Sequence, residues 1–587
     1  MRQAESKAWL PVKSTTRGRA GPSWGPGPQA HALHIACVPF FCAGKSRPGD
    51  GRRSGTLARS RLLCAAMWAA RFRYWRQRRV ALALATASGV LFAASFCGYD
   101  HDALAWICLV PAVWALDNPK LGSRGALGIG WLMGLVAHLG VYTWLVGMLE
   151  DFGYLPLPWA IVGYVFICWV QSVLFAGFGL GTYILRHRYK VPIGLAAPVV
   201  MVLCEWLTPA LFPSYLANTQ YQQPWVIQGC GLWGVLGLSY MLVWSNTALY
   251  QALAWLKNPS SPRPTQAVGI WAVCLVAMLA YGQQTTARLD ATIAQTTRKL
   301  SVGLVQTNMG IYEKTDNPAE GQRRHLDQSL EVEAAGAQLV IWAESGYYYA
   351  LEPNTTNVKR QVMGRLQTPL LFGALRNQPG PEGVEQYNSA FLADKHGELL
   401  GSYDKTHLLA FGEFLPFGEA MPWLYALSPQ TSRFWRGRHL RPLQFDGIRI
   451  GTLICYEDIL PDFVRQVMTQ SPDVLVNLTN DAWFGQSREP RIHLALAVFR
   501  AVEHHRYLVR STNTGISAII DPVGRILKET PVFTRANLVG DVKPMTGTTL
   551  YQILGDWPGY VSLLALAWWT RAGWRDLLRR RLKTAAA

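Results

Sequence analysis

Long apolar segments are the feature that most constrains the fold of this chain. A helix that crosses a lipid bilayer needs about 20 mostly apolar residues, so the two shortest segments are marginal by themselves. Their repetition nevertheless predicts a polytopic α-helical membrane protein with about eight spans. The segments are Val80 to Phe96, Ala103 to Leu116, Ala126 to Val146, Pro158 to Leu185, Pro192 to Leu211, Trp225 to Leu256, Ala267 to Tyr281 and Trp557 to Trp569.

The basic residues between these segments predict their orientation. If the N-terminus is cytoplasmic, the predicted cytoplasmic connections all contain Lys or Arg, whereas the opposite connections before residue 282 contain neither. Lys and Arg are retained on the cytoplasmic side, and the alternation holds only when all eight segments are counted. The basic connections contain Lys120 and Arg124, then Arg186, Arg188 and Lys190, then Lys257 and Arg263, and finally Arg571 to Lys583.

Composition excludes two broad classes of protein. Only 16% of the residues are charged, against about 25% in a typical soluble protein, and 50% are hydrophobic. The net charge of +19 resides in the ends, because residues 1–79 contribute +14 and residues 571–583 contribute +5. A nucleic-acid-binding surface needs basic residues on its folded domains. The chain is therefore predicted to be neither wholly soluble nor a partner of nucleic acid.

The N-terminal 66 residues differ from everything that follows. They are rich in Arg, Gly, Pro and Ser and show no sustained helical or strand period, which predicts a disordered basic tail. Met67 stands before a basic lead into the first span, so it is an alternative start and the tail upstream is expected to be dispensable. The expected division is this tail (1–66), spans one to seven (67–285), a catalytic domain (286–553), and the eighth span with a basic cytoplasmic tail (554–587).

The segment between the seventh and eighth spans has the pattern of a layered α/β domain. Short apolar runs alternate with amphipathic helices at Gly321 to Ala335 and His493 to His504. Such alternation predicts buried strands covered by helices. The expected strands are Leu300 to Gln306, Leu339 to Ala343, Leu370 to Ala374, Ser389 to Ala393, Ile448 to Cys455, Val474 to Leu478, Tyr507 to Thr512 and Ile516 to Asp521.

Cys455 is the only cysteine of the ten that lies in this domain. A lone thiol on the outer side of the membrane cannot form a disulfide within its own domain, although it can serve as a small buried apolar side chain. It follows the strand at Ile448 to Ile454 and precedes a helix expected at Pro461 to Met468. The start of a helix favours a thiolate and can stabilise an oxyanion, so Cys455 is a candidate nucleophile.

Two other loops contain candidate partners for that thiol. Glu344 follows a strand, at the edge of the sheet where α/β sites are usually built. Lys405 and Glu413 lie in an aromatic loop, Ser402 to Phe417, with too few charges for a solvated face. Each of these residues alone is more typical of a helix cap or a surface charge, and only their occurrence together indicates a site.

Glu344, Lys405 and Cys455, in that order and each after a strand, resemble the nitrilase superfamily. The sequences WAES, YDKTHLLAFGEFLPF, LICYED and NLTNDAWFG are similar to those of its membrane-embedded branch, the bacterial apolipoprotein N-acyltransferases. The resemblance covers roughly residues 80–570 and rests mainly on topology in the membrane part. It implies a nitrilase-like α-β-β-α sandwich inserted before the last span, in the bacterial inner membrane, with the catalytic domain on the periplasmic side.

The resemblance also implies a role for each candidate residue. Cys455 would be the nucleophile, Glu344 the general base and Lys405 the cation that stabilises the oxyanion. Glu413 would position the lysine, Tyr456 and Glu457 would support the site, and Trp483 and Phe484 would contact substrate in a mobile loop at the lipid entrance. The chain departs from the family at Thr315, where many members have Trp, and this changes how substrate is held there.

The implied reaction is ping-pong acyl transfer. A phospholipid, typically phosphatidylethanolamine, would give its sn-1 acyl chain to Cys455 as a thioester. The α-amine of a diacylglyceryl-cysteine in an apolipoprotein would then accept it as an amide. No cofactor is implied, and no metal, because the domain lacks Cys/His ligand spacing.

Three alternatives remain at this stage. A membrane-tethered nitrilase-type amidase would use water as the acyl acceptor. A transporter with an accessory domain would need ionisable residues in its spans, and these contain few, chiefly His138 and Glu205. An inactive scaffold is disfavoured because Glu344, Lys405 and Cys455 are all present.

Overall fold

The computed structural model describes residues 78–587 except 211, 261–262, 381–382, 428–430 and 586–587, and it leaves undescribed the side chains of residues 311, 312, 315, 572 and 574–587. The predicted disordered tail at 1–66 lies outside the described residues. Contacts divide the chain into two units, Met1–Arg71 and Phe72–Ala587. The described residues all belong to the second unit.

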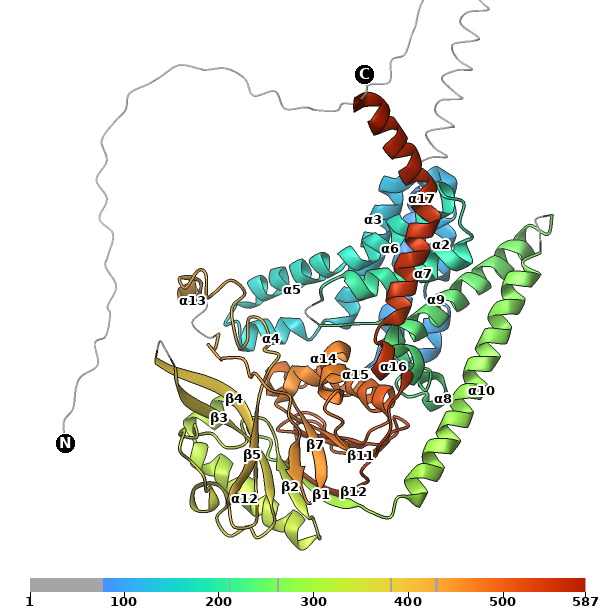
Figure 1. Cartoon of the computed structure of the whole chain (residues 1–587). Coiled ribbons are helices and arrows are strands. Elements are labelled where there is room, and N and C mark those ends of the chain that lie inside the picture. Colours follow the sequence, from blue (N-terminus) through green and yellow to red (C-terminus); the bar gives the residue numbers. More distant parts are fainter. Residues whose placement is uncertain (1–77, 211, 261–262, 381–382, 428–430, 586–587) are drawn as a thin grey trace, which may run out of the picture. The chain divides into compact units, whose positions relative to one another are not determined.

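A helical region forms the first half of this unit (Figure 1). After Arg78–Ser95 its elements are η1 (Asp102–Trp106), α2 (Val110–Leu116), η2 (Pro119–Leu121), α3 (Gly122–Val141), α4 (Leu145–Asp151), α5 (Leu157–Gln171), α6 (Val173–His187), α7 (Ile193–Leu207), η3 (Leu216–Gln220), α8 (Pro224–Ile227), α9 (Cys230–Lys257) and α10 (Thr265–Gln295). Two C-terminal helices, α16 (Leu550–Leu554) and α17 (Trp557–Ala585), complete it.

Four of the described helices are long and apolar enough to cross a membrane. They are Arg78–Ser95, Pro119–Val141, Leu157–His187 and Thr265–Gln295; Asp102–Leu116 and Ile193–Leu207 are apolar but shorter. The predicted second span is short because a 3₁₀ turn occupies its first residues, and the predicted fourth bends at Ser172, between α5 and α6. The structure therefore supports a membrane protein, and the count of eight remains a prediction.

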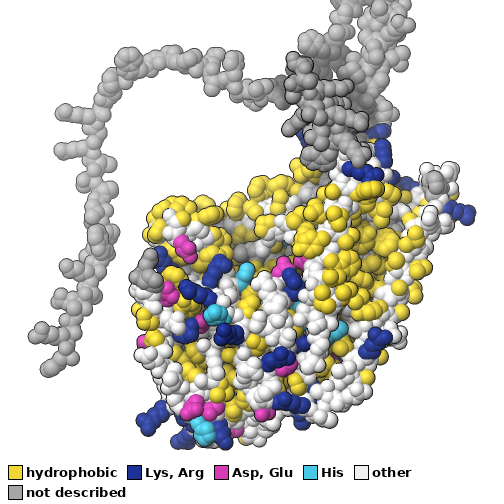
Figure 2. All heavy atoms as spheres, viewed as in Figure 1, with side chains coloured by type: hydrophobic (Ala, Val, Ile, Leu, Met, Phe, Trp, Pro, Cys, Tyr) yellow, Lys and Arg dark blue, Asp and Glu magenta, His cyan; other side chains and the backbone are white. Residues whose placement is uncertain are grey.

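Large apolar side chains on the helical region point outward. Figure 2 shows them gathered over the helices, whereas charged side chains are scattered over the other half of the molecule. Trp159, Phe166 and Trp169 on α5 are exposed, as are Val273 and Val276 on α10. A contiguous apolar surface of this kind is unfavourable in water and is typical of contact with lipid.

The second half is a sandwich of two six-stranded sheets. In the first sheet the strand order is β12-β1-β2-β3-β4-β5, and in the second it is β11-β10-β9-β8-β7-β6. The strands are β1 (Leu300–Gln306), β2 (Leu339–Trp342), β3 (Leu370–Gly380), β4 (Gly383–Ala393), β5 (Leu399–Asp404), β6 (Leu443–Phe445), β7 (Ile448–Ile454), β8 (Val474–Thr479), β9 (Leu508–Thr512), β10 (Ala518–Ile520), β11 (Ile526–Glu529) and β12 (Ala536–Val542).

Helices cover the outer face of each sheet and complete an α-β-β-α sandwich, as predicted. Helix α12 (Pro318–Ala334) packs on β1 and β12, while α15 (Glu489–His504) packs on β9 and α14 (Pro461–Met468) packs on α15. Strands β1, β2 and β3 run parallel, and so do β7, β8 and β9. Parallel strands end at one edge of a sheet, so the loops after β2, β7 and β8 gather the candidate residues there.

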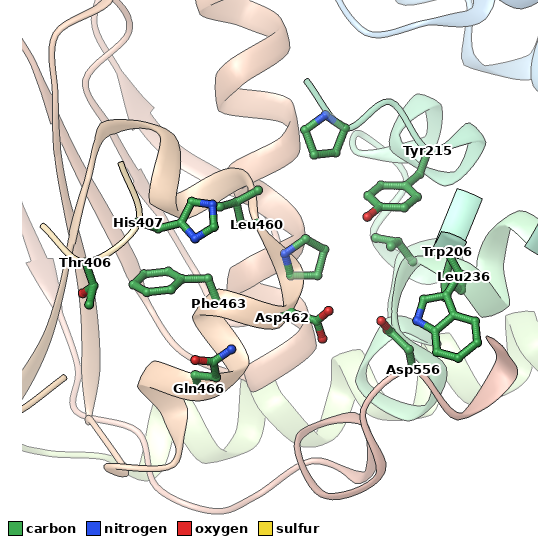
Figure 3. Close-up of a pocket in the computed structure, with 13 residues that line it drawn as sticks. Trp206, Tyr215, Leu236, Thr406, His407, Leu460, Asp462, Phe463, Gln466 and Asp556 are labelled. Atoms are coloured by element: carbon green, nitrogen blue, oxygen red, sulfur yellow. The ribbon is translucent and has the colours of Figure 1, made fainter. Parts of the chain in front are cut away.

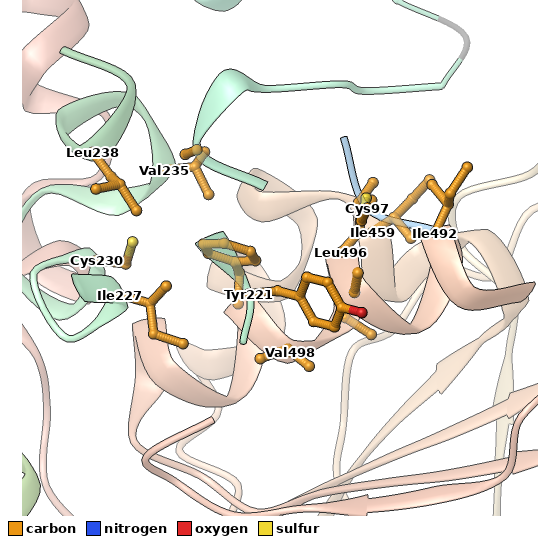
Figure 4. Packing of buried hydrophobic residues seen from close by; sticks show 14 of the residues in the cluster. Cys97, Tyr221, Ile227, Cys230, Val235, Leu238, Ile459, Ile492, Leu496 and Val498 are labelled. Atoms are coloured by element: carbon orange, nitrogen blue, oxygen red, sulfur yellow. The ribbon is translucent and has the colours of Figure 1, made fainter. Parts of the chain in front are cut away.

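The sandwich and the helical region share one hydrophobic core. Ile492, Leu496 and Val498 of α15 belong to the same buried cluster as Cys230 and Val235 of α9 (Figure 4). Helix α15 is consequently buried on both sides, between the second sheet and α9. This packing holds the end of the sheet that contains Cys455 against the helical region.

Candidate active site

Cys455 occupies a strained turn between a strand and a helix. Strand β7 ends at Ile454, Cys455 begins the 3₁₀ turn η5 (Cys455–Ile459), and its φ is +51°. A non-glycine residue in this left-handed conformation costs about 1–3 kcal/mol. Asn477 compensates in part, because its Nδ2 donates a hydrogen bond of 3.0 Å to the Cys455 carbonyl oxygen. The sharp strand-to-helix turn predicted from the sequence is thereby confirmed.

Glu457 joins this turn to the loop that contains the lysine. Its buried carboxylate accepts hydrogen bonds from the backbone N–H of Ile454 at 2.8 Å, of Thr406 at 2.8 Å and of His407 at 2.9 Å. The Tyr403 hydroxyl donates to it at 2.9 Å. Burial raises the pKa of Glu457 to about 7. These bonds fix the position of the Thr406–His407 backbone relative to Cys455.

Lys405, Glu344 and Glu413 form a buried acid–lysine group. Lys405 Nζ lies 2.9 Å from the Glu413 carboxylate and 3.5 Å from Glu344 Oε1. Asn388 of β4 donates its Nδ2 to Glu344 Oε1 at 2.7 Å and to Glu413 Oε1 at 2.9 Å. Leu409 N donates to the other oxygen of Glu413 at 2.8 Å. Every one of these side chains is therefore held by at least one directed bond.

Electrostatic interactions link this acid–lysine group to the thiol of Cys455. We call the four residues together the Cys455 site: Glu344, Lys405, Glu413 and Cys455. Burial raises the pKa of the Cys455 thiol well above its usual value, and the Glu344 carboxylate raises it further, whereas Lys405 lowers it. Burial also raises the pKa of Glu344. Burial alone would lower the pKa of Lys405, but Glu413 and Glu344 raise it above its usual value, so the lysine is an ammonium ion. Burial thus favours the protonated thiol at Cys455, while Lys405 favours the ionised form of Glu344.

The other predicted site residues lie at the boundary with the helical region. The Phe484 ring is 5.2 Å from the Trp144 ring, and the Trp483 ring is 4.3 Å from that of Phe152. Phe484 is buried and Trp483 is 40% exposed. The Tyr456 ring lies 6.3 Å from Phe212 and 6.1 Å from His407. These aromatic side chains connect the Cys455 turn and η6 (Asp481–Phe484) to the helical region.

A second buried group of charges, which the sequence did not reveal, lies beside the Cys455 turn. His493 Nε2 is 2.9 Å from Asp458 Oδ1, and its Nδ1 is 3.0 Å from Asp481 Oδ1. Arg510 donates to both carboxylates, at 3.1 Å in the case of Asp481. Burial and Arg510 lower the pKa of His493, but Asp458 and Asp481 outweigh them and raise it to about 10. These four residues are called the Arg510 cluster.

The Arg510 cluster is balanced without a metal ion. The ligand atoms of Asp481, Glu489 and His493 lie within 4.8 Å of one another, the one such grouping among the residues that the structure describes. A metal would need a free imidazole lone pair, yet both nitrogens of His493 face carboxylates, and Arg510 supplies a second positive charge. The residues fit a set of buried ion pairs better than a metal centre.

A cavity of about 370 Å³ lies between the sandwich and the helical region. Figure 3 shows Thr406 and His407 of the lysine loop on one side and Trp206 and Tyr215 of the helical region on the other. The volume is within the range of small-ligand sites. Thr406 and His407, which follow Lys405, line this cavity, whereas none of the four residues of the Cys455 site does.

Comparisons with known proteins match both halves of the chain. The carbon-nitrogen hydrolase family profile matches residues 301–550, and the profile of the apolipoprotein N-acyltransferase N-terminal domain matches residues 88–248. An apolipoprotein N-acyltransferase of Geobacter metallireducens is 31% identical over 485 residues, which cover 81% of this chain and 91% of that protein. One from Azotobacter vinelandii is 31% identical and is covered over 96% of its length.

A solved structure matches less than half of the chain. An amidase from Nesterenkonia sp. AN1 is 22% identical, with a TM-score of 0.29, and the match covers 42% of this chain and 90% of that one. The sequence relatives, by contrast, extend through the helical region as well.

Proposed function

This chain belongs to the apolipoprotein N-acyltransferase family, and from that premise we propose how its residues perform the reaction. The enzyme matures lipoproteins by transferring an acyl chain from a phospholipid to the N-terminal amine of an apolipoprotein. The amidase and transporter alternatives are set aside, because family membership extends over both halves of the chain. The observation that carries the proposal is that Glu344 and Lys405 lie 3.5 Å apart and both interact electrostatically with the buried thiol of Cys455.

In the first half-reaction Cys455 attacks the sn-1 ester of the donor. As the bond between Sγ and the carbonyl carbon forms, the thiol proton passes to Glu344, because a free thiolate is unfavourable in this buried, acidic site. The ammonium of Lys405 stabilises the developing oxyanion, and Glu413 holds that ammonium in place. The carbon–oxygen bond then breaks, Glu344 returns the proton to the leaving oxygen, and lysophospholipid departs from a Cys455 thioester.

In the second half-reaction the amine of diacylglyceryl-cysteine attacks the thioester. Glu344 accepts the amine proton as the carbon–nitrogen bond forms, and Lys405 again stabilises the oxyanion. The carbon–sulfur bond breaks, and the thiol recovers its proton. Asn388 orients both carboxylates through its hydrogen bonds. Tyr456 and Glu457 support the turn, while Trp483 and Phe484 border the path from the bilayer to the site.

The two half-reactions provide the test. Phospholipid without acceptor should leave a hydroxylamine-sensitive acyl adduct on Cys455 and release about one lysophospholipid per active site, as ping-pong catalysis requires. Cys455→Ala should abolish both products. Diacylglyceryl lipopeptide should discharge the adduct as an amide, and N-acetylated lipopeptide should not. An adduct on another residue, or discharge to water alone, would contradict the proposal.

The finer assignments belong to the same proposal. Phosphatidylethanolamine is the donor, and the protein resides in the inner membrane with its catalytic domain on the periplasmic side. Residues 67–285 form spans one to seven, residues 286–553 form the catalytic domain, and residues 554–587 form the eighth span and the basic cytoplasmic tail. The alternation of basic connections supports the orientation. A reporter that is active only outside the cytoplasm should work after Ala287 and fail after Lys583, and the reverse pattern would overturn it.

A further inference from the structure

Lys314 is a buried ammonium group without a partner. It lies on α11 (Ile311–Asp316), the residue is 8% exposed, and its Nζ has no hydrogen-bond partner among the residues that the structure describes. Its Nζ lies over the face of Tyr348, 5.2 Å from the ring centroid. Fully buried lysines are nearly always paired, so this side chain is expected to meet a group that the protein itself does not supply.

This lysine lies next to the Cys455 site. Tyr348 follows Glu344 by four residues, in the loop after β2. Burial lowers the pKa of Lys314 to about 8, and Glu344 opposes that effect. Lys314 in turn favours the ionised form of Glu344. Lys314 thus lies against the loop that contains Glu344 and interacts electrostatically with that carboxylate, whereas Lys405 is already paired with two carboxylates.

An anionic group of a bound substrate would pair with this buried ammonium. Of the two substrates in the proposed function, the donor phospholipid has a phosphodiester, whereas the diacylglyceryl-cysteine of the acceptor has no phosphate. We propose that Lys314 binds the phosphodiester of the donor phospholipid beside Glu344 while the sn-1 ester faces Cys455. This inference rests on the proposed function and adds to it the residue that recognises the donor.

The chemistry of lysine fits this role. An ammonium binds phosphate as a point charge, and a bond between two charged groups is about twice as strong as a neutral one. The phosphate would also offset the cost of burying Lys314, which no protein group now offsets through a hydrogen bond. The Tyr348 ring orients the ammonium in the absence of lipid.

The test compares two acyl donors on one variant in the full-length enzyme. Lys314→Met keeps the length of the side chain and removes its charge. One donor is a phospholipid, and its reaction is measured by the release of lysophospholipid. The other donor is the p-nitrophenyl ester of the same fatty acid, which lacks phosphate. The ratio of the two kcat/KM values should fall about ten- to a hundredfold in the variant. Lys314→Arg should restore most of the ratio.

Three results would overturn the inference. Equal losses with both donors would mean that Lys314 acts only through Glu344, and unchanged kinetics with both would mean that it has no role. Inorganic phosphate that changes the p-nitrophenyl ester reaction of the wild type, but not of Lys314→Met, would assign the site to free phosphate. Failure of the proposed function is distinguishable, because the wild-type enzyme itself would then release no lysophospholipid.

Discussion

The Cys455 site and the Arg510 cluster are both buried at the ends of parallel strands, yet they balance their charges differently. In the Arg510 cluster two carboxylates meet two cations, and both ring nitrogens of His493 are occupied. In the Cys455 site one ammonium faces two carboxylates and a thiol, and an unpaired lysine lies nearby. The first arrangement is complete without substrate, and the second is not.

The difference in charge pairing separates residues that contribute to stability from residues that contribute to catalysis. The fully paired charges of the Arg510 cluster contribute to stability, because they hold η5, η6, α15 and β9 together. Removing one partner of such a pair leaves the other charge buried and uncompensated, which is destabilising. Charged groups that are incompletely paired can stabilise the charge that develops in a transition state. Substitutions in the Cys455 site should therefore lower activity, whereas substitutions in the Arg510 cluster should lower stability.

Glu344→Gln should produce the largest loss of activity with little loss of stability. The amide preserves the shape of the side chain but cannot accept the thiol proton, and general-base assistance is worth about 10²–10⁴-fold. We expect the rate of Cys455 acylation to fall by that factor while the thermal unfolding midpoint in detergent stays close to that of the wild type. Normal acylation by the variant would remove Glu344 from the mechanism.

His493→Leu should show the opposite behaviour. It leaves Asp458 and Asp481 buried with Arg510 as their only counter-charge, and removing one partner of a buried ion pair typically costs about 3–5 kcal/mol. The variant should unfold at a markedly lower temperature or fail to accumulate. Glu489→Gln is the matched control, because burial raises the pKa of Glu489 to about 8 and the side chain is mostly neutral already. Equal destabilisation by both substitutions would contradict the comparison.

Stability should fall as pH rises, and the Arg510 cluster should set the window. The pKa of His493 is raised from 6.5 to about 10, so its contribution is complete below pH 6.5 and is lost as pH rises through 10. Glu489, raised from 4.5 to about 8, changes in the same direction. The unfolding midpoint should decline between about pH 6.5 and 10 in the wild type. A flat profile there, or an equal decline in His493→Gln, would exclude His493 as the cause.

Sequence reasoning succeeded where a residue's environment is fixed by its neighbours along the chain. Buried strands such as β1 and β7 are continuous apolar runs, and the ends of β2 and β7 placed Glu344 and Cys455 correctly. The strands β5, β6, β11 and β12 were missed because they are partly exposed and mix polar with apolar residues. The sequence predicted only the apolar part of helix α10. The helix continues to Gln295, and these last turns were missed because they are polar.

The parts of the site that depend on strand register were beyond the sequence. Asn477 pairs with Leu453 on one side and with Arg510 on the other, and only this register brings Arg510 to the Cys455 turn. Asn388 likewise reaches Glu344 from a different strand. Both asparagines interrupt apolar strands, and a polar residue at a buried strand position is the signal that would have identified them.

Trp483→Ala should have the smallest effect of these changes, and it tests the boundary between the two halves of the molecule. Trp483 is 40% exposed and packs against Phe152, just after α4. An aromatic pair is worth about 0.5–1.5 kcal/mol, so we expect kcat/KM for phospholipid to fall by less than about tenfold. The loss should appear mainly in KM, because Trp483 contacts neither Glu344 nor Lys405 in the described structure. Trp568→Ala, at an exposed tryptophan on α17, is the control for a general effect of removing a lipid-facing ring. A loss in kcat equal to that of Glu344→Gln would instead place Trp483 within the Cys455 site.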